Sequence, residues 1–189
     1  MDFFVYSRDA AGTQALRDDD DLLEQHWSYM DGFAASMIAR GPTFRADRET
    51  VTGSLHVVGL PDVDAAREFA AREPNNRAGL YDEHLVRRFE NLLGRTMWEF
   101  PGASEEPRFL VIAHSRRIPA PAESLPAALG RRLILYGALR TLDGAEPAGV
   151  ALAVQARSRT SVAGLVEEAR IAEPARDLQI HDWEFGGRR

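Results

Sequence analysis

Residues 37–42 read MIARGP and residues 52–58 read TGSLHVV, and this pattern decides the fold because it occurs twice. Its second occurrence reads LILYGA over residues 133–138 and AGVALAV over residues 148–154. The glycine of each stretch returns 96 positions later. A pattern that recurs at a fixed spacing is the signature of a repeated structural unit. The sequence therefore predicts two copies of one unit in tandem.

The opening strand of each copy and the segment between the copies define the expected domains. FFVYSR (residues 3–8) matches FLVIAH (residues 109–114) at a spacing of 106, so the second copy is about ten residues shorter before its first glycine. Residues 99–107, EFPGASEEP, have the composition of a linker. We therefore expect one domain over residues 1–98 and a second over residues 108–189.

The first copy is predicted to follow the order strand, helix, strand, strand, helix, strand. Apolar residues at spacings of three and four indicate a helix that starts in the acidic run 18–21, continues to Arg40 and ends at Gly41. The other elements that we place are strands at 2–8, 52–58 and 84–89 and a helix from Pro61 to Glu73. This is the order of a ferredoxin-like βαββαβ unit. Because its helices cover one face of the sheet, we expect an α+β protein in which the two units pack sheet to sheet.

The composition is that of an ordinary globular protein, and it excludes several kinds of chemistry. The chain has 189 residues, of which 44% are hydrophobic and 28% charged, with a formal net charge of −6. It contains 23 arginines but neither lysine nor cysteine. Disulfides, thiolate nucleophiles, thiolate metal sites and lysine Schiff bases are therefore excluded. The remaining chemistry depends on histidine, carboxylate and arginine side chains.

The sequence carries no signal for export, for a membrane or for nucleic acid. The apolar run at residues 3–6 is too short for the core of a signal peptide, and no apolar stretch reaches the length of about 18 residues that a membrane span needs. A pI near 5.4 disfavours nucleic acid and anionic lipid as partners. We expect a cytoplasmic protein without membrane or nucleic-acid partners.

Four motifs in the first copy together resemble a known family. They read QHWSYM at residues 25–30, ARGP at 39–42, TGS at 52–54 and EPNNRAGLY at 73–81. In this order and spacing they are similar to the YCII-related (YciI-like) family, over residues 2 to about 92. The resemblance implies a ferredoxin-like fold that pairs as a dimeric α+β barrel, here within one chain. It also implies lyase chemistry without a cofactor, such as dehydrochlorination of a ring-derived substrate.

The resemblance places the family's catalytic pair at His26 and Glu73. The acid is more often aspartate in the family, so Glu73 keeps the charge and adds one methylene. A neutral imidazole oriented by a carboxylate is a general base that works near neutral pH. The residues alone leave other interpretations open: His26 as a core histidine bonded to a carbonyl, and Glu73 as the end of a helix before Pro74.

Four further residues are candidates for binding a substrate. Arg8 could bind a carboxylate or enolate, and Ser54 could donate a hydrogen bond to the same oxygen. Trp27 and Tyr81 could form walls of the pocket. The alternatives are a surface arginine at a strand end and aromatic residues of the core. His56 and His84 are also expected on strands, where either could face solvent.

The second copy is predicted to be degenerate. The position equivalent to His26, counted fifteen residues back from Gly137, is Ala122, so the base is missing. Glu173-Pro174 resembles the Glu73-Pro74 pair only with an insertion. The residues His114, His181 and Asp182 have no spacing typical of a metal motif, and no metal site is expected.

Three functions remain open at this stage. The first is a lyase or isomerase in which His26 moves a proton on a small anionic carbonyl or ring compound. The second is a non-catalytic small-molecule-binding or accessory protein, or a purely structural interaction module, and the third is a cofactor-free monooxygenase or polyketide cyclase on the same barrel. In each case we expect a pseudo-dimeric monomer or a homodimer.

Overall fold

The computed structural model describes residues 1–102, 105–171 and 177–187. The N-terminal half comprises β1 (Asp2–Asp9), α1 (Gln14–Arg17), α2 (Asp20–Asp31), the 3-10 turn η1 (Ala34–Ser36), β2 (Met37–Phe44), β3 (Val51–Gly59), α3 (Val63–Arg72), α4 (Pro74–Arg77) and β4 (Tyr81–Asn91). The C-terminal half comprises η2 (Met97–Glu99), β5 (Arg108–His114), η3 (Ala122–Ser124), α5 (Ala127–Gly130), β6 (Leu133–Arg140), β7 (Pro147–Gln155), α6 (Arg159–Glu168) and β8 (Asp177–Trp183).

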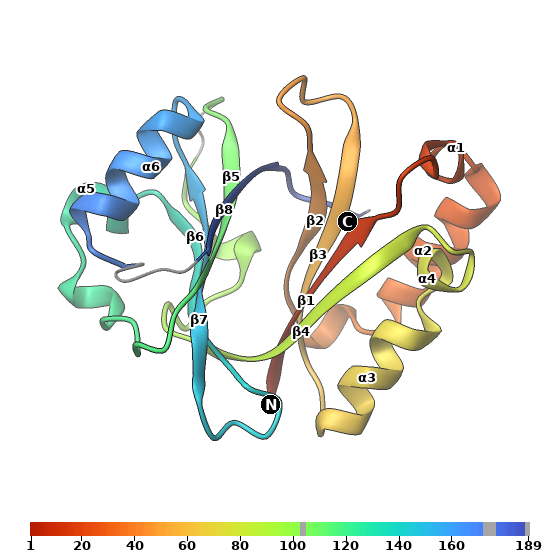
Figure 1. Ribbon diagram of the computed structural model, residues 1–189, viewed down its shortest axis with the longest axis horizontal. Coiled ribbons are helices and arrows are strands. Elements are labelled where there is room, and N and C mark those ends of the chain that lie inside the picture. Colours follow the sequence, from red (N-terminus) through yellow and green to blue (C-terminus); the bar gives the residue numbers. More distant parts are fainter. Residues whose placement is uncertain (103–104, 172–176, 188–189) are drawn as a thin grey trace.

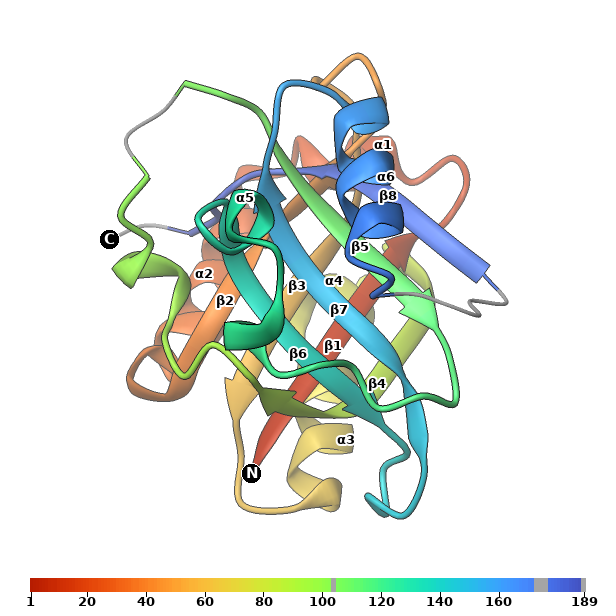
Figure 2. The same cartoon turned by 90° about the vertical axis from the view of Figure 1, so that its left-hand side faces the viewer.

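The eight strands form one closed barrel in the order β1-β3-β2-β8-β5-β7-β6-β4. Neighbouring strands are antiparallel, and the two halves meet at the pairs β2–β8 and β4–β6. Helices α1 to α4 lie outside the strands of the N-terminal half, and α5 and α6 lie on the opposite side of the barrel (Figure 1). In Figure 2, where the C-terminal half faces the viewer, α5 and α6 lie in front of its strands. The molecule is therefore an α+β barrel with helices on two sides.

Helix α2 begins where the acidic run predicts. The Asp19 carboxylate caps the helix by accepting from Leu22 N at 2.9 Å, and Asp20 and Asp21 add negative charge to the positive N-terminus. The strands predicted at 2–8, 52–58 and 84–89 are confirmed as β1, β3 and β4.

The prediction that the first helix continues to Arg40 is wrong. Helix α2 ends at Asp31, and residues 37–44 form strand β2, the strand that sequence reasoning did not place. Gly41 therefore does not end a helix; it lies within β2, where another part of the backbone comes very close. A Cβ added there would lie 1.9 Å from the carbonyl oxygen of Glu184. The glycine is therefore needed because β2 passes directly against the segment that follows β8.

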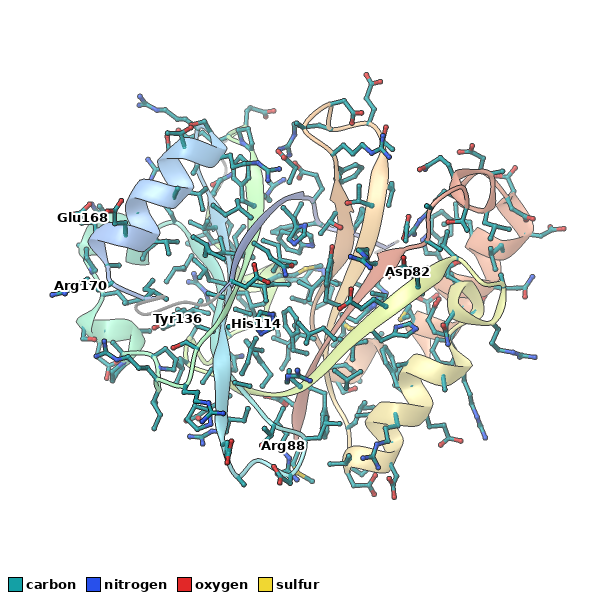
Figure 3. The ribbon with its side chains drawn as sticks, in the orientation of Figure 1. Asp82, Arg88, His114, Tyr136, Glu168 and Arg170 are labelled. Atoms are coloured by element: carbon teal, nitrogen blue, oxygen red, sulfur yellow. The ribbon has the colours of Figure 1, made fainter. Side chains whose placement is uncertain are left out.

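Alternating side chains divide the buried residues into one interior core and two outer layers. The barrel interior is filled by residues of both halves, including Phe4, Leu55, Leu110 and Leu135. The outer faces pack against the helices, with Phe3, Val5, Val58 and Phe69 in the N-terminal half and Val111, Val150, Leu152 and Val162 in the C-terminal half. Side chains of the strands extend into the barrel and toward the helices, and Tyr136 lies on the side of α5 and α6 (Figure 3). Except at irregularities such as the one in β6, consecutive strand residues therefore belong to different layers.

The strands of the two halves pair in the same register. The equivalent pairs are Ser7 with Ser54 and Ala113 with Val150, and Arg40 with His56 and Tyr136 with Leu152. Their positions differ by 106 in the first strand and by 96 in the others, as the sequence pattern predicts. Every position of the N-terminal sheet in these pairs therefore has a defined counterpart in the C-terminal half.

Ion pairs reinforce the joint between β2 and β8. Two residue pairs, Thr43 with Trp183 and Phe44 with Asp182, form this joint within the described residues. Arg48, from the β2–β3 loop, contacts Asp182 at 2.5 Å and also contacts Glu184. The guanidinium thus links the N-terminal half to the end of the C-terminal one. None of the described helices is long and apolar enough to cross a membrane.

Candidate functional site

A cavity of about 320 Å³ lies between α2 and the helix-facing side of β2 and β3. Its lining includes the polar and aromatic residues Arg17, Asp18, His26, Trp27, Arg40, Glu49, Ser54 and His56. Phe185, Gly186 and Gly187, which follow β8, form another part of its wall. The cavity therefore brings together helix and strand residues of the N-terminal half and a segment from the other end of the chain.

His26 and Glu73 are in direct contact at this cavity. Nδ1 of His26 lies 2.6 Å from Oε1 of Glu73, and the Glu73 carboxylate is buried. Because an ionised carboxylate only accepts hydrogen bonds, Nδ1 donates to Glu73, and Nε2 is the ring nitrogen left to exchange a proton with another molecule. The geometry is that of a base with an orienting acid.

The chain holds Glu73 in place between two helices. Glu73 follows α3, which ends at Arg72, and precedes Pro74, the first residue of α4. Its Oε2 accepts from Asn76 N at 2.9 Å and so caps α4, while Oε1 binds His26. The acid therefore ends one helix, caps the next and orients the imidazole at once, which reconciles the two interpretations of this residue.

His56 lies behind His26 and is a residue that sequence reasoning did not select. The two rings are 5.6 Å apart, and His56 is buried on the helix-facing side of β3. Burial lowers the pKa of His56 well below its usual value, and the nearby charges of His26, Arg40 and Arg17 lower it further. His56 is therefore a neutral part of the cavity floor. Its spacing of two from Ser54 could have indicated that both side chains share one face.

Ser54 belongs to a hydrogen-bonded network beside His56. Its hydroxyl accepts from the Tyr81 hydroxyl and from Arg17, each at 3.2 Å. Arg17 also makes a two-pronged pair with Asp9, at 2.6 and 3.0 Å. Burial raises the pKa of Tyr81 to about 12, with a further contribution from Glu73, so the phenol stays protonated and donates. Tyr81 thus supports Ser54 from behind.

The predicted binding residues are only partly brought together. Trp27 and Ser54 line the cavity, whereas Tyr81 is buried beyond Ser54. Arg8 is on the surface, where its guanidinium contacts Asp82 and Glu83 and more than half of its side chain is exposed. Asp82 lies near the start of β4 in Figure 3. Arg17, in the short helix α1, and Arg40, in β2, are the arginines that line the cavity within the described residues.

The C-terminal half lacks the polar residues of this site. Tyr136, Val150 and Leu152 occupy the positions equivalent to Arg40, Ser54 and His56. Ala122, the counterpart that we assigned to His26, begins η3 and packs against the apolar layer of this half.

Two further predictions concern the C-terminal half. Glu173-Pro174 lies outside the described residues. No group of three histidine or acidic side chains within the described ranges is placed to hold a metal. Asp182 is instead paired with Arg48 and Arg159.

The fold and this site define an α+β barrel with a His–Glu pair at a cavity in its N-terminal half. Residues 1–90 match the profile of the YCII-related domain family. The N-terminal half of the chain is therefore a YCII-related domain. No curated protein is similar enough to the chain to count as a match.

Solved structures resemble the chain over one or both halves. A 5-chloro-2-hydroxyhydroquinone dehydrochlorinase from Burkholderia phenoliruptrix AC1100, in complex with 2,5-dihydroxybenzoquinone, is 27% identical, with 48% of this chain and 95% of that chain covered and a TM-score of 0.45. A mutant chlorite dismutase from Candidatus Nitrospira defluvii is 9% identical, with 97% and 91% covered and a TM-score of 0.58. The second likeness supports the barrel fold over nearly the whole chain.

Proposed function

We propose that this protein is a cofactor-free lyase or isomerase that acts on a small anionic carbonyl or ring compound. The observation that carries the proposal is the 2.6 Å contact of His26 with buried Glu73 at a cavity of about 320 Å³. Arg17 and Arg40 line the same cavity, together with the acidic residues Asp18 and Glu49, and are the groups that would pair with an anionic ligand.

In the proposed reaction His26 Nε2 removes a proton from a carbon next to a carbonyl group. The C–H electron pair moves to the carbonyl oxygen and forms an enolate, while the imidazolium is stabilised by its Nδ1–H bond to Glu73. Arg17 and Arg40 offset the negative charge of the enolate, and the Ser54 hydroxyl donates to its oxygen. The enolate then either expels an anion from the adjacent carbon, which is elimination, or takes a proton at another carbon, which is isomerisation.

Non-catalytic binding is the second candidate. Arg17, Ser54 and Tyr81 form a connected network, and such a network holds an anion without any proton transfer. This function predicts binding that does not depend on the imidazole. The two candidates therefore differ in what replacement of His26 changes.

We further infer that the two halves are ferredoxin-like units of one duplicated ancestor, packed sheet to sheet as an intramolecular counterpart of a dimeric barrel. The shared strand register supports this inference. The domain boundaries that we propose remain residues 1–98 and 108–189, with residues 99–107 as the linker. The degenerate second unit then completes the barrel for the first.

The test is proton exchange in D₂O with a panel of anionic ring and carbonyl compounds. Turnover is followed by mass spectrometry as deuterium uptake or release of a leaving anion. His26→Asn should slow turnover by about 10²- to 10⁴-fold, the usual contribution of a general base. His114→Asn is the matched control in the other half and should leave turnover unchanged. Native turnover in folded His26→Asn would overturn the proposal, and oxygen uptake with an aromatic compound would indicate a monooxygenase instead.

A further inference from the structure

Each half of the barrel is reached by a short segment from the other half. After β8, Glu184 N donates to Pro42 O at 3.3 Å and Gly186 N donates to Arg40 O at 3.0 Å. After β4, Leu92 N donates to Tyr136 O at 2.9 Å. Figure 1 shows both crossings, the dark-blue one beyond β8 and the yellow-green one at the end of β4. Because Tyr136 is the counterpart of Arg40, Leu92 is the counterpart of Gly186.

The two crossing segments differ in the size of their side chains at these equivalent positions. Leu92 and Leu93 pack against the apolar layer beneath α5 and α6 and so help to fill the C-terminal half. Gly186 and Gly187 have no side chains and line the open cavity of the N-terminal half. The presence or absence of two leucines therefore distinguishes a filled half from an open one.

The glycines are required by the close approach of this segment to β2. A Cβ on Gly186 would lie 2.6 Å from the Cα of Gly41. Gly187 has a φ of +82°, and a Cβ there would lie 2.3 Å from Cζ of Arg40. Phe185 is then the one large side chain that the segment contributes to the cavity wall within the described residues. The aromatic ring is held by contacts to Trp183 and to the Arg108 guanidinium.

The volume that remains limits the ligand. A cavity of about 150 Å³ is known to hold a benzene ring. The cavity here, about 320 Å³, has room for a single ring with its substituents. Trp27 and Phe185 offer aromatic surfaces, while Arg17 and Arg40 offer positive charge beside the acidic Asp18 and Glu49.

We propose that residues 185–187, contributed by the C-terminal half, form the wall that sets the size of the molecule admitted to the site. The wall admits a single-ring anion and excludes fused polycyclic ones, with Phe185 as the residue that determines specificity. This inference rests on the proposed function only in taking the cavity as the substrate site. It also gives the C-terminal half a role in recognition although its own polar residues are absent.

The test uses the absence of cysteine from the chain. Ser54→Cys places one thiol in the cavity, and its labelling rate is measured with a small reagent, methyl methanethiosulfonate, and a polycyclic one, pyrene maleimide. Ile118→Cys, at a site that is 65% exposed, gives the ratio of the two rates for an open thiol. The rate with pyrene maleimide, divided by the rate with methyl methanethiosulfonate, should be about tenfold or more lower at position 54 than at position 118. Pocket shape produces effects of this size.

Phe185→Ala combined with Ser54→Cys should remove most of this discrimination, and Phe185→Leu should remove part of it while keeping the apolar packing. Leu92→Ala, at the equivalent crossing, is the matched control and should leave the ratio as it is. An unchanged ratio in folded Phe185→Ala and Phe185→Leu, or an equal change in Leu92→Ala, would overturn the proposal. Labelling needs no turnover, so failure here is distinct from unchanged activity in His26→Asn, which would overturn the proposed base alone.

Discussion

The two halves of the barrel share a strand register but differ in what their helix-facing surfaces carry. Arg40, Ser54 and His56 face a cavity in the N-terminal half, whereas their counterparts Tyr136, Val150 and Leu152 are buried in a closed apolar layer. The N-terminal half therefore leaves polar groups beside an open space, and the C-terminal half uses the same positions for packing. One backbone arrangement thus supports a site on one side and a stabilising core on the other.

The largest effect is expected when the N-terminal half receives the residues that the C-terminal half has at the equivalent positions. Arg40→Tyr, Ser54→Val and His56→Leu together should abolish anion binding and reduce turnover by about 10²-fold or more, because loss of a single oxyanion donor has effects of that size. Turnover and binding are measured alongside circular dichroism. Native activity in a folded triple variant would contradict the assignment of these positions.

Glu73→Gln separates orientation of the base from capping of the helix. The amide oxygen can still accept from Asn76 N, so the thermal midpoint should change little, while turnover should fall by about 10²-fold because the amide no longer stabilises the imidazolium. A pH–rate profile should move with the substitution. The control is Glu99→Gln, which alters a capping acid outside the cavity. Equal losses of activity in both variants would argue against a positioning role for Glu73.

Acid sensitivity offers a third test, because His181 in the C-terminal half is partly buried. Burial, with Arg159 nearby, lowers the pKa of His181 to about 4. Between about pH 6.5 and 4 the unfolded chain then binds more protons than the folded one, so stability falls as the pH falls, by roughly 3 kcal/mol for this residue. In urea unfolding at several pH values, the free energy of unfolding should depend less on pH in His181→Gln than in His114→Gln. Identical pH dependence in the two variants would count against this account.

The smallest expected effect concerns Tyr136, the counterpart of Arg40. Its hydroxyl donates to Ala120 O at 2.7 Å, and a single buried hydrogen bond contributes about 1 kcal/mol. Tyr136→Phe should lower the free energy of unfolding by about that amount and leave turnover unchanged. Chemical denaturation and the D₂O assay measure the two quantities. A loss of turnover would show that the C-terminal layer takes part in the chemistry.

Much of the fold could be predicted because the repeat and the alternation of apolar residues are local signals. Strand β2 was missed for a physical reason: residues 37–40 continue the apolar spacing of α2, and pairing with β3 and β8 overrides that local pattern. Gly41 was interpreted as a helix end because its close approach to Glu184 joins positions far apart in the sequence, and no local pattern indicates such a contact.

The site shows the same limit. His26 and Glu73 follow from family motifs, but Arg17 and His56 join the site through strand register and the path of α1. Phe185 follows β8, far from the other cavity residues in the sequence, and nothing in its local sequence indicates that it lies at the cavity wall. Arg8 lies in a strand end that points to the surface, so its charge alone was a poor guide.

The joint between β2 and β8 also has a consequence for how the protein folds. Phe44 pairs with Asp182, so the barrel can close only after strand β8 has been synthesised and has met β2. Contacts between such distant positions make folding slow. Since residues 185–187 line the cavity, the binding site should form only at this last closure, and recovery of ligand binding should lag behind recovery of helical signal during refolding.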